Sequence, residues 1–96
     1  MLVIPAIDVL GGRCVRLRRG DYADPTVFSD DPTVVAQQFI GAGARRIHLV
    51  DLDAARGAPL AESSAVIAAM LSLIRDAGRE SEVGGGVRSL AVAQRP

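Results

Sequence analysis

Short apolar runs alternate with helical patterns along the chain. Four segments favour extended structure, namely residues 2–7, 13–17, 46–52 and 82–84. The first run ends at Asp8 and a Gly11-Gly12 turn joins it to the second, whereas the third, RIHLVDL, is almost continuously apolar. A strand buried on both faces of a parallel sheet has this composition. The pattern therefore predicts a parallel sheet of three main strands, with an enlarged loop after the first.

A first helix is predicted between the first and second main strands. Asp30 and Asp31 are candidates for its N-cap, and Pro32 suits its first turn. The residues at helical spacing are Val34, Val35, Gln38 and Phe39. Gly41 and Gly43 then end the pattern, so this helix fills most of the interval before the next strand.

A second helix has the clearest periodicity in the chain. Ser63 or Ser64 is expected to cap it, and Gly78 follows as its C-terminal stop. Its apolar positions recur at three and four residues: Val66, Ile67, Met70, Leu71 and Ile74. Ser89 is the expected cap of a third helix, which the chain leaves unfinished at Pro96.

The spacing of the strand ends predicts a fold class. The ends fall at Asp8, Asp51 and Gly84, 43 and 33 residues apart, which suits βα units with one enlarged loop. We expect residues 1–96 to form one α/β domain, the first three strands of an incomplete (βα)8 TIM barrel. Right-handed crossovers would place both complete helices on one face of the sheet and leave the other apolar and open. A doubly wound sheet is the alternative, although IDVLGGR lacks the G-x-G-x-x-G fingerprint.

Composition restricts the partners of such a domain. Hydrophobic residues make up 49% of the chain, and eleven basic residues balance eleven acidic ones, so no nucleic acid partner is predicted. The N-terminal apolar run is short and contains an Asp, so neither a signal peptide nor a membrane span is expected. A single cysteine, Cys14, predicts a reduced thiol buried in a strand of a cytoplasmic protein. The open sheet face predicts self-association unless something covers it.

Candidate chemistry lies at the carboxyl ends of the predicted strands, where TIM barrels carry their active sites. Asp8 and Asp51 both occupy such positions, and a partly desolvated carboxylate there suits a general base. Each Asp could equally form an Asx turn. The third strand runs instead into GGGVRS, in which glycine backbone N–H groups, a helix N-terminus and Arg88 suit a phosphate group. Glycines also make plain turns, so this alternative stays open.

Four blocks together resemble the ProFAR isomerases of histidine biosynthesis, the phosphoribosylformimino-aminoimidazole carboxamide ribotide isomerases. The blocks are PAIDV at 5–9, VRLRRGDY at 15–22, HLVDLDAARG at 48–57 and VGGGVRS at 83–89. They follow the order and spacing of that family over essentially the whole chain. The related cyclase typically has a P-C-x-D opening and continues its second strand into Asp-Ile-Thr, whereas this chain reads PAID and VDLD. The isomerase family is therefore preferred.

The resemblance implies a cofactor-free and metal-free Amadori rearrangement of a small bisphosphorylated aminoaldose to its aminoketose. By that resemblance Asp8 would be the catalytic proton acceptor. The residues implied in substrate and phosphate binding are Arg16, Gly20, His48, Asp51, Gly85, Gly86 and Arg88. Strand alternation adds that His48 and Asp51 face opposite ways if their strand is regular through both.

Three alternatives to this function remain open at the level of sequence. The chain stops within the third helix, so the general acid and the second phosphate site expected from later strands are absent, and it could be a non-catalytic fragment or a phosphate-binding partial barrel. His48 could be a core histidine, and Arg16 could belong to a solvated loop edge. A dual-substrate isomerase that also serves tryptophan biosynthesis fits the same motifs.

Overall fold

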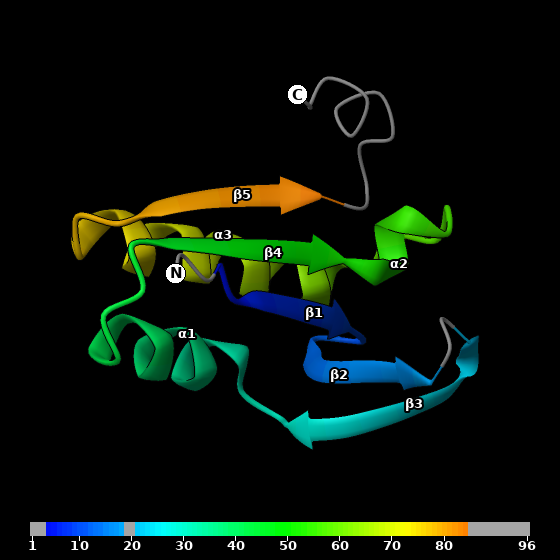
Figure 1. The fold of residues 1–96 in the computed structure, drawn as a ribbon. Coiled ribbons are helices and arrows are strands. Elements are labelled where there is room, and N and C mark those ends of the chain that lie inside the picture. The colour runs from blue at the N-terminus through cyan, green and yellow to red at the C-terminus, as the bar shows by residue number, and fades with distance from the viewer. Residues whose placement is uncertain (1–3, 19–20, 85–96) are drawn as a thin grey trace.

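The computed structural model describes residues 4–18 and 21–84 and contains one mixed β-sheet with helices packed on it (Figure 1). Its elements in chain order are β1 (Ala6–Leu10), β2 (Arg13–Arg18), β3 (Asp21–Ser29), α1 (Pro32–Gly41), β4 (Arg46–Asp51), α2 (Leu52–Ala55), α3 (Ala61–Asp76) and β5 (Glu80–Gly84). The sheet order is β3-β2-β1-β4-β5. β1, β4 and β5 are parallel, as the sequence predicts, whereas β2 and β3 add an antiparallel hairpin at the edge of β1. The chain is thus a small α/β domain.

The turn between β1 and β2 explains why β1 ends later than predicted. Gly11 and Gly12 have φ angles of 62° and 78°, the positive values that a tight two-residue hairpin requires. Because the hairpin pairs Asp8 with Val15 and Leu10 with Arg13, the strand continues through Asp8. The prediction that β1 ends at Asp8 is therefore wrong. Asp8 nevertheless lies beside Val50, one residue before the end of β4.

β3 occupies the segment that the sequence assigned to an enlarged loop, and that assignment is wrong. The segment contains Asp21, Asp24 and Pro25, residue types that are depleted in strands. Proline is tolerated on an edge strand, and β3 is the edge of this sheet. The β2–β3 ladder also contains two register shifts, which accommodate the irregular sequence.

The first helix follows its predicted signals. Asp31 is the N-cap of α1, and its carboxylate accepts a hydrogen bond of 3.1 Å from the Thr33 backbone N–H. Pro32 occupies the first turn, and Gly43, just beyond the helix, has a φ of 94°. The predicted beginning and end of this helix are confirmed.

The second helix is confirmed as α3, but its predicted cap is wrong. α3 begins at Ala61 after Leu60, which makes no side-chain capping bond. Ser63 lies inside the first turn, and its hydroxyl bonds the Gly12 N–H and the Asp53 carboxylate instead. Gly78 follows the helix with a φ of 74°, as the stop signal predicts.

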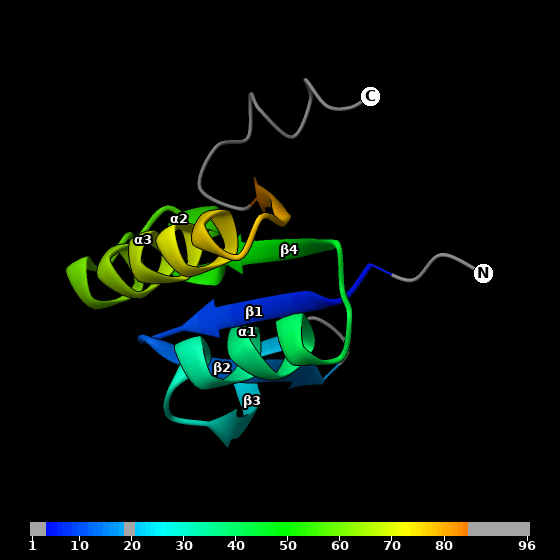
Figure 2. The same cartoon turned by 90° about the vertical axis from the view of Figure 1, so that its left-hand side faces the viewer.

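The hydrophobic core lies between one face of the sheet and the two long helices. α1 and α3 lie side by side on that face (Figure 2). The core consists of Ile7, Val9, Cys14, Val35, Ala36, Ile47, Leu49, Ile67, Met70 and Ile74. Placement of both helices on one face and burial of Cys14 are therefore confirmed. None of the helices in residues 4–18 and 21–84 is long and apolar enough to span a membrane.

The opposite face of the sheet is not apolar, so that expectation is wrong. Side chains alternate along each strand, and the positions between the core residues of β1, β4 and β5 include Asp8, His48 and Glu82. We call this side of β1, β4 and β5 the polar face. Its charged side chains explain why the helices cover the other side, where most of the alternating positions are aliphatic.

Candidate functional site on the polar face

Asp8 and His48 lie near each other on the polar face. β1 and β4 pair in parallel register, with Ala6 opposite His48 and Asp8 opposite Val50. His48 and Asp8 are therefore diagonal neighbours on the same side of the sheet. The structure thus brings together two residues that are 40 positions apart in the sequence.

Partial burial changes the pKa of the Asp8 carboxyl. Desolvation raises the pKa of Asp8 above its ordinary value, because the charged form loses part of its hydration. The positive charges of His48 and then Arg16 oppose this effect and lower the pKa. The carboxylate is therefore a stronger base than an exposed aspartate, and its charge is stabilised by Arg16 and, when the ring is protonated, by His48.

Arg16 belongs to β2, the strand that pairs with β1 through Asp8 and Val15. Its side chain is exposed to solvent, but its charge still acts on the Asp8 carboxyl. Arg16 is thus a solvent-exposed strand residue, not part of a loop, that acts electrostatically on Asp8. The hairpin turn at Gly11-Gly12 determines this arrangement, because it fixes the register of β2 on β1.

His48 contacts β5 on its other side. Its Nδ1 lies 3.3 Å from the Oε1 atom of Glu82, which is directly opposite in the parallel register. A Cβ atom placed on Gly84 would lie 3.4 Å from the His48 Nε2, so the ring reaches over this glycine. The His48 side chain is 38% exposed, so it is not an enclosed core histidine.

Asp51 lies apart from this group. It belongs to the core-facing set of β4 positions and is 8% exposed. Its carboxylate accepts a hydrogen bond of 3.0 Å from the Ala54 backbone N–H and caps α2. His48 and Asp51 therefore face opposite sides of the sheet, as strand alternation indicates.

The remaining predicted binding residues cannot be compared with the structure. Gly20, Gly85, Gly86 and Arg88 lie outside the described residues, as does Ser89, the expected cap of the third helix. β5 leads directly into the glycine run, since it ends at Gly84. The predicted phosphate site thus follows the strand that carries Glu82.

A buried polar network beside the site was not predicted from the sequence. Asp53 is 1% exposed and Ser63 is fully buried. The Asp53 Oδ2 accepts hydrogen bonds from the Gly11 N–H at 2.8 Å and from the Ser63 hydroxyl, whose oxygen accepts from the Gly12 N–H at 2.9 Å. The network fixes the hairpin turn to α2 and α3. A second carboxylate two residues after Asp51 was the available signal, but its partners are 42 and 10 positions away.

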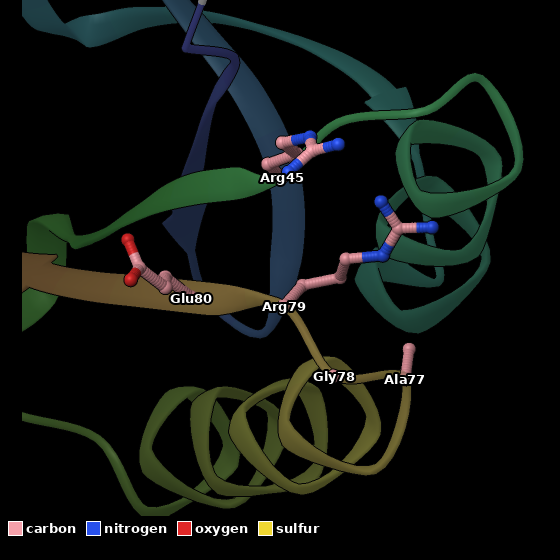
Figure 3. A pocket seen from close by; sticks show the side chains of 5 residues that line it. All are labelled: Arg45, Ala77, Gly78, Arg79 and Glu80. Carbon is pink, nitrogen blue, oxygen red and sulfur yellow. The ribbon is translucent and has the colours of Figure 1, made fainter.

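A hollow of about 440 Å³ lies at the other end of the strands (Figure 3). Arg45 and Arg79 extend beside it from the beginnings of β4 and β5, and Arg79 donates a hydrogen bond of 3.2 Å to the Ala44 carbonyl. Ala77 and Gly78, which follow the end of α3, also line it. Cations are favoured near helix C-termini because the terminal carbonyls carry partial negative charge. We therefore attribute the two arginines at the hollow to stabilisation of the C-terminal end of α3. The hollow lies away from Asp8.

The fold and the polar face define the class: an α/β domain with an ionisable cluster on one face of its parallel strands. A family profile described as "Histidine biosynthesis protein" matches residues 2–95. The chain belongs to this histidine biosynthesis family.

Curated relatives share about half of their aligned residues with the chain. The Acidithiobacillus ferrooxidans protein is 53% identical over 90 residues, which are 93% of this chain and 36% of that protein. The Bordetella avium and Thermomicrobium roseum proteins are 49% and 50% identical over 96 residues, 99% of this chain and 38% of each protein. All three are named 1-(5-phosphoribosyl)-5-((5-phosphoribosylamino)methylideneamino)imidazole-4-carboxamide isomerase. The chain therefore spans little more than a third of their length.

Proposed function

We propose that residues 1–96 form the N-terminal part of a TIM-barrel isomerase that converts ProFAR, the aminoaldose in the relatives' name, to its aminoketose. The observation that carries the proposal is the juxtaposition of Asp8 and His48 on the polar face, with the Asp8 pKa raised by burial. In a closed barrel this face would line the interior, and the carboxyl ends of its strands would surround the substrate.

Asp8 acts as the general base in this proposal. Isomerisation requires removal of the proton at C2 of the opened sugar, and a carboxylate whose pKa is raised accepts that proton more readily than an ordinary aspartate. The positive charge of Arg16 keeps Asp8 ionised and ready to accept it, and His48 adds to this effect whenever its ring is protonated. Ring opening needs a separate acid, for which we look to the part of the relatives beyond their match to this chain.

The binding roles are also part of the proposal. His48 and Arg16 contact the substrate from β4 and β2, together with Gly20, while Gly85, Gly86 and Arg88 hold one terminal phosphate through backbone N–H groups and a guanidinium. Asp51 is proposed as a further substrate-binding residue at the end of β4, where its carboxylate also caps α2. No metal or cofactor is required, and a cytoplasmic location suits the reduced Cys14.

The test is a completed enzyme, which joins residues 1–96 to the C-terminal part of the Bordetella avium protein beyond its match to this chain. We expect it to isomerise ProFAR, and we expect the 96-residue chain alone not to do so. Asp8→Asn in the completed enzyme should abolish turnover and leave ProFAR binding measurable by calorimetry. Retained turnover in this variant would remove Asp8 as the base.

A parallel assay with phosphoribosylanthranilate tests the dual-substrate alternative. Turnover of both substrates by the completed enzyme, each dependent on Asp8, would favour it. Turnover of ProFAR alone would restrict the proposal to histidine biosynthesis. An inactive completed enzyme that is folded and binds phosphate would favour the phosphate-binding partial barrel instead.

A further inference from the structure

Glu82 and His48 form a contact across two parallel strands of the polar face. They are directly opposite in the β4–β5 register, and the Glu82 Oε1 lies 3.3 Å from the His48 Nδ1. An ionised carboxylate only accepts hydrogen bonds, so Nδ1 must carry the proton that it donates to Glu82. In the neutral ring this leaves Nε2 as the acceptor.

Gly84 limits the other side of the imidazole. The nearest atoms to a Cβ built on Gly84 would be the His48 Nε2 at 3.4 Å and Cε1 at 3.6 Å. The ring therefore extends from β4 over the backbone of β5 and toward the end of that strand. The two nitrogens lie in different places: Nδ1 faces Glu82, and Nε2 lies over Gly84, the last residue of β5 and the first of the glycine run.

Glu82 is itself oriented by a second partner. Its Oε2 lies 3.4 Å from the Arg46 Nη1, while Arg46 also donates from Nε to the Glu80 Oε1 at 2.9 Å. The two carboxylate oxygens of Glu82 are thus divided between Arg46 and His48. Because each oxygen has a separate partner, the carboxylate is restrained in rotation and presents Oε1 to the imidazole.

Stability alone does not account for this arrangement. The Glu82 and His48 side chains are 48% and 38% exposed, and half-exposed ion pairs contribute little to the free energy of folding. The contact does determine which imidazole nitrogen is protonated and where the other one lies. His48 is also the diagonal neighbour of Asp8 across β1 and β4, so the placement of its ring bears on the proposed base.

We propose that Glu82 is a positioning residue that fixes the Nδ1-protonated form of His48 and thereby presents Nε2 to a hydroxyl group of the sugar-phosphate substrate. The substrate part of this inference rests on the proposed function. Glu82 does not touch the substrate. It acts through the imidazole, as a carboxylate does when it orients a histidine ligand or base.

The first test is nitrogen NMR of the 96-residue chain. His48 is its only histidine, so the two imidazole ¹⁵N signals need no further assignment. At alkaline pH we expect Nδ1 to be protonated in the wild type. Glu82→Gln should keep this form, because the amide oxygen still accepts from Nδ1, whereas Glu82→Ala should give a mixture of both tautomers.

Glu80→Gln is the matched control. Glu80 lies on the same strand and also pairs with Arg46, but no hydrogen bond links it to His48 among the contacts of the described residues. Its ¹⁵N pattern should equal that of the wild type. The inference is overturned if Glu82→Ala keeps the wild-type tautomer, or if Glu80→Gln shifts it equally. Backbone amide spectra verify that each variant is folded.

The second test separates the inference from the proposed function. In the completed enzyme, Glu82→Ala should lower kcat/KM for ProFAR about ten-fold, the usual effect of one lost hydrogen bond, and Glu82→Gln should restore most of it. Glu80→Gln should have no effect. If the enzyme is active and Glu82→Ala has full kcat/KM, the positioning role is wrong. If the tautomer result holds but the completed enzyme turns over neither substrate, the proposed function fails and the positioning of His48 stands.

Discussion

The buried network around Ser63 makes the sharpest prediction about stability. The Ser63 hydroxyl donates to the Asp53 carboxylate and its oxygen accepts from the Gly12 N–H at 2.9 Å. Ser63→Ala removes both interactions, leaves the Gly12 N–H without its partner, and takes one donor from a carboxylate that is 1% exposed. The variant leaves the aliphatic core unchanged, so the network alone is tested.

The expected loss follows from the two interactions. A hydrogen bond to a charged group contributes about 1.5–3 kcal/mol, and a fully buried N–H left unsatisfied costs about 1–3 kcal/mol, of which the half-buried Gly12 N–H bears only a part. Because such contributions are not additive, we expect Ser63→Ala to lower the free energy of unfolding by about 3 kcal/mol. A domain of this length is stable by roughly 5–14 kcal/mol, so the loss is a large part of the total.

Urea unfolding followed by circular dichroism measures this loss, with Ser64→Ala as the control. Ser64 is the exposed neighbour of Ser63 in α3, so its substitution brings the same gain in helix propensity without the network. With a slope of about 1.5 kcal/mol per molar urea, Ser63→Ala should move the midpoint down by about 2 M. Ser64→Ala should stay within about 0.5 kcal/mol of the wild type.

Equal midpoints for Ser63→Ala and Ser64→Ala would refute the reasoning. A double-mutant cycle with Asp53→Ala adds an independent measure, because residues of one hydrogen-bond network couple by about 0.5–3 kcal/mol. A coupling energy of zero between Ser63 and Asp53 would mean that the two side chains do not interact in solution.

Three further predictions concern the Asp8 carboxyl, the hairpin turn and the buried thiol. Burial raises the pKa of Asp8, so the folded chain binds this proton more tightly than the unfolded chain, and the resulting stability is lost as pH rises through the raised pKa. Asp8→Asn should therefore lose less stability than the wild type between about pH 4 and 7 in urea titrations, and parallel pH profiles would contradict this. Gly12→Ala, at a φ of 78° and with its new Cβ 3.4 Å from the Glu62 Cβ, should destabilise the chain by about 1–2 kcal/mol. Gly41→Ala, in α1 with nothing within 4 Å, should stabilise it by up to about 1 kcal/mol in the same melts, and the opposite order would be evidence against the turn geometry. Burial raises the pKa of Cys14 to about 11, so a disulfide reagent at pH 8 should label the thiol no faster than the chain unfolds, and faster labelling of the folded chain would show that the thiol is accessible.

The sequence predicts those elements whose local signals agree with their surroundings. α1 has a cap, a first-turn proline and a terminal glycine, and α3 has sustained periodicity, so both were predicted correctly. β3 was missed because Asp21 and Pro25 argue against a strand, and only pairing with β2 makes a strand of this segment. The prediction that Ser63 caps α3 was wrong because its side chain also depends on distant segments. Its hydroxyl has partners on two other segments, which no local pattern reveals.

The sequence indicates which residues belong to the candidate site better than it indicates how they are arranged. Asp8 and His48 are predicted from motifs, whereas their diagonal placement depends on the β1–β4 register and the proposed role of Glu82 on the β4–β5 register. Register is a tertiary property, since a shift of one residue would move Asp8 to the core face. The alternation of Glu80 and Glu82 before the glycine run was visible as a pattern, but nothing in it indicated a histidine partner on another strand.

The β1–β2 hairpin links Asp8 on the polar face to the buried Asp53 network. Asp8 is partly desolvated, and above its raised pKa the folded chain carries this carboxylate at a cost that an asparagine would avoid. The buried Asp53 network bonds both residues of the turn at the end of the β1–β2 hairpin and holds that turn to α2 and α3. If Ser63→Ala releases the turn, the register of Val15 on Asp8 should loosen as well, and Arg16 should withdraw from the carboxyl. The Asp8 pKa, followed by ¹³C NMR of its carboxyl carbon, should then rise in Ser63→Ala, because one of the two charges that lower it has moved away. An unchanged Asp8 pKa in a destabilised Ser63→Ala chain would show that the network supports the fold without controlling the site.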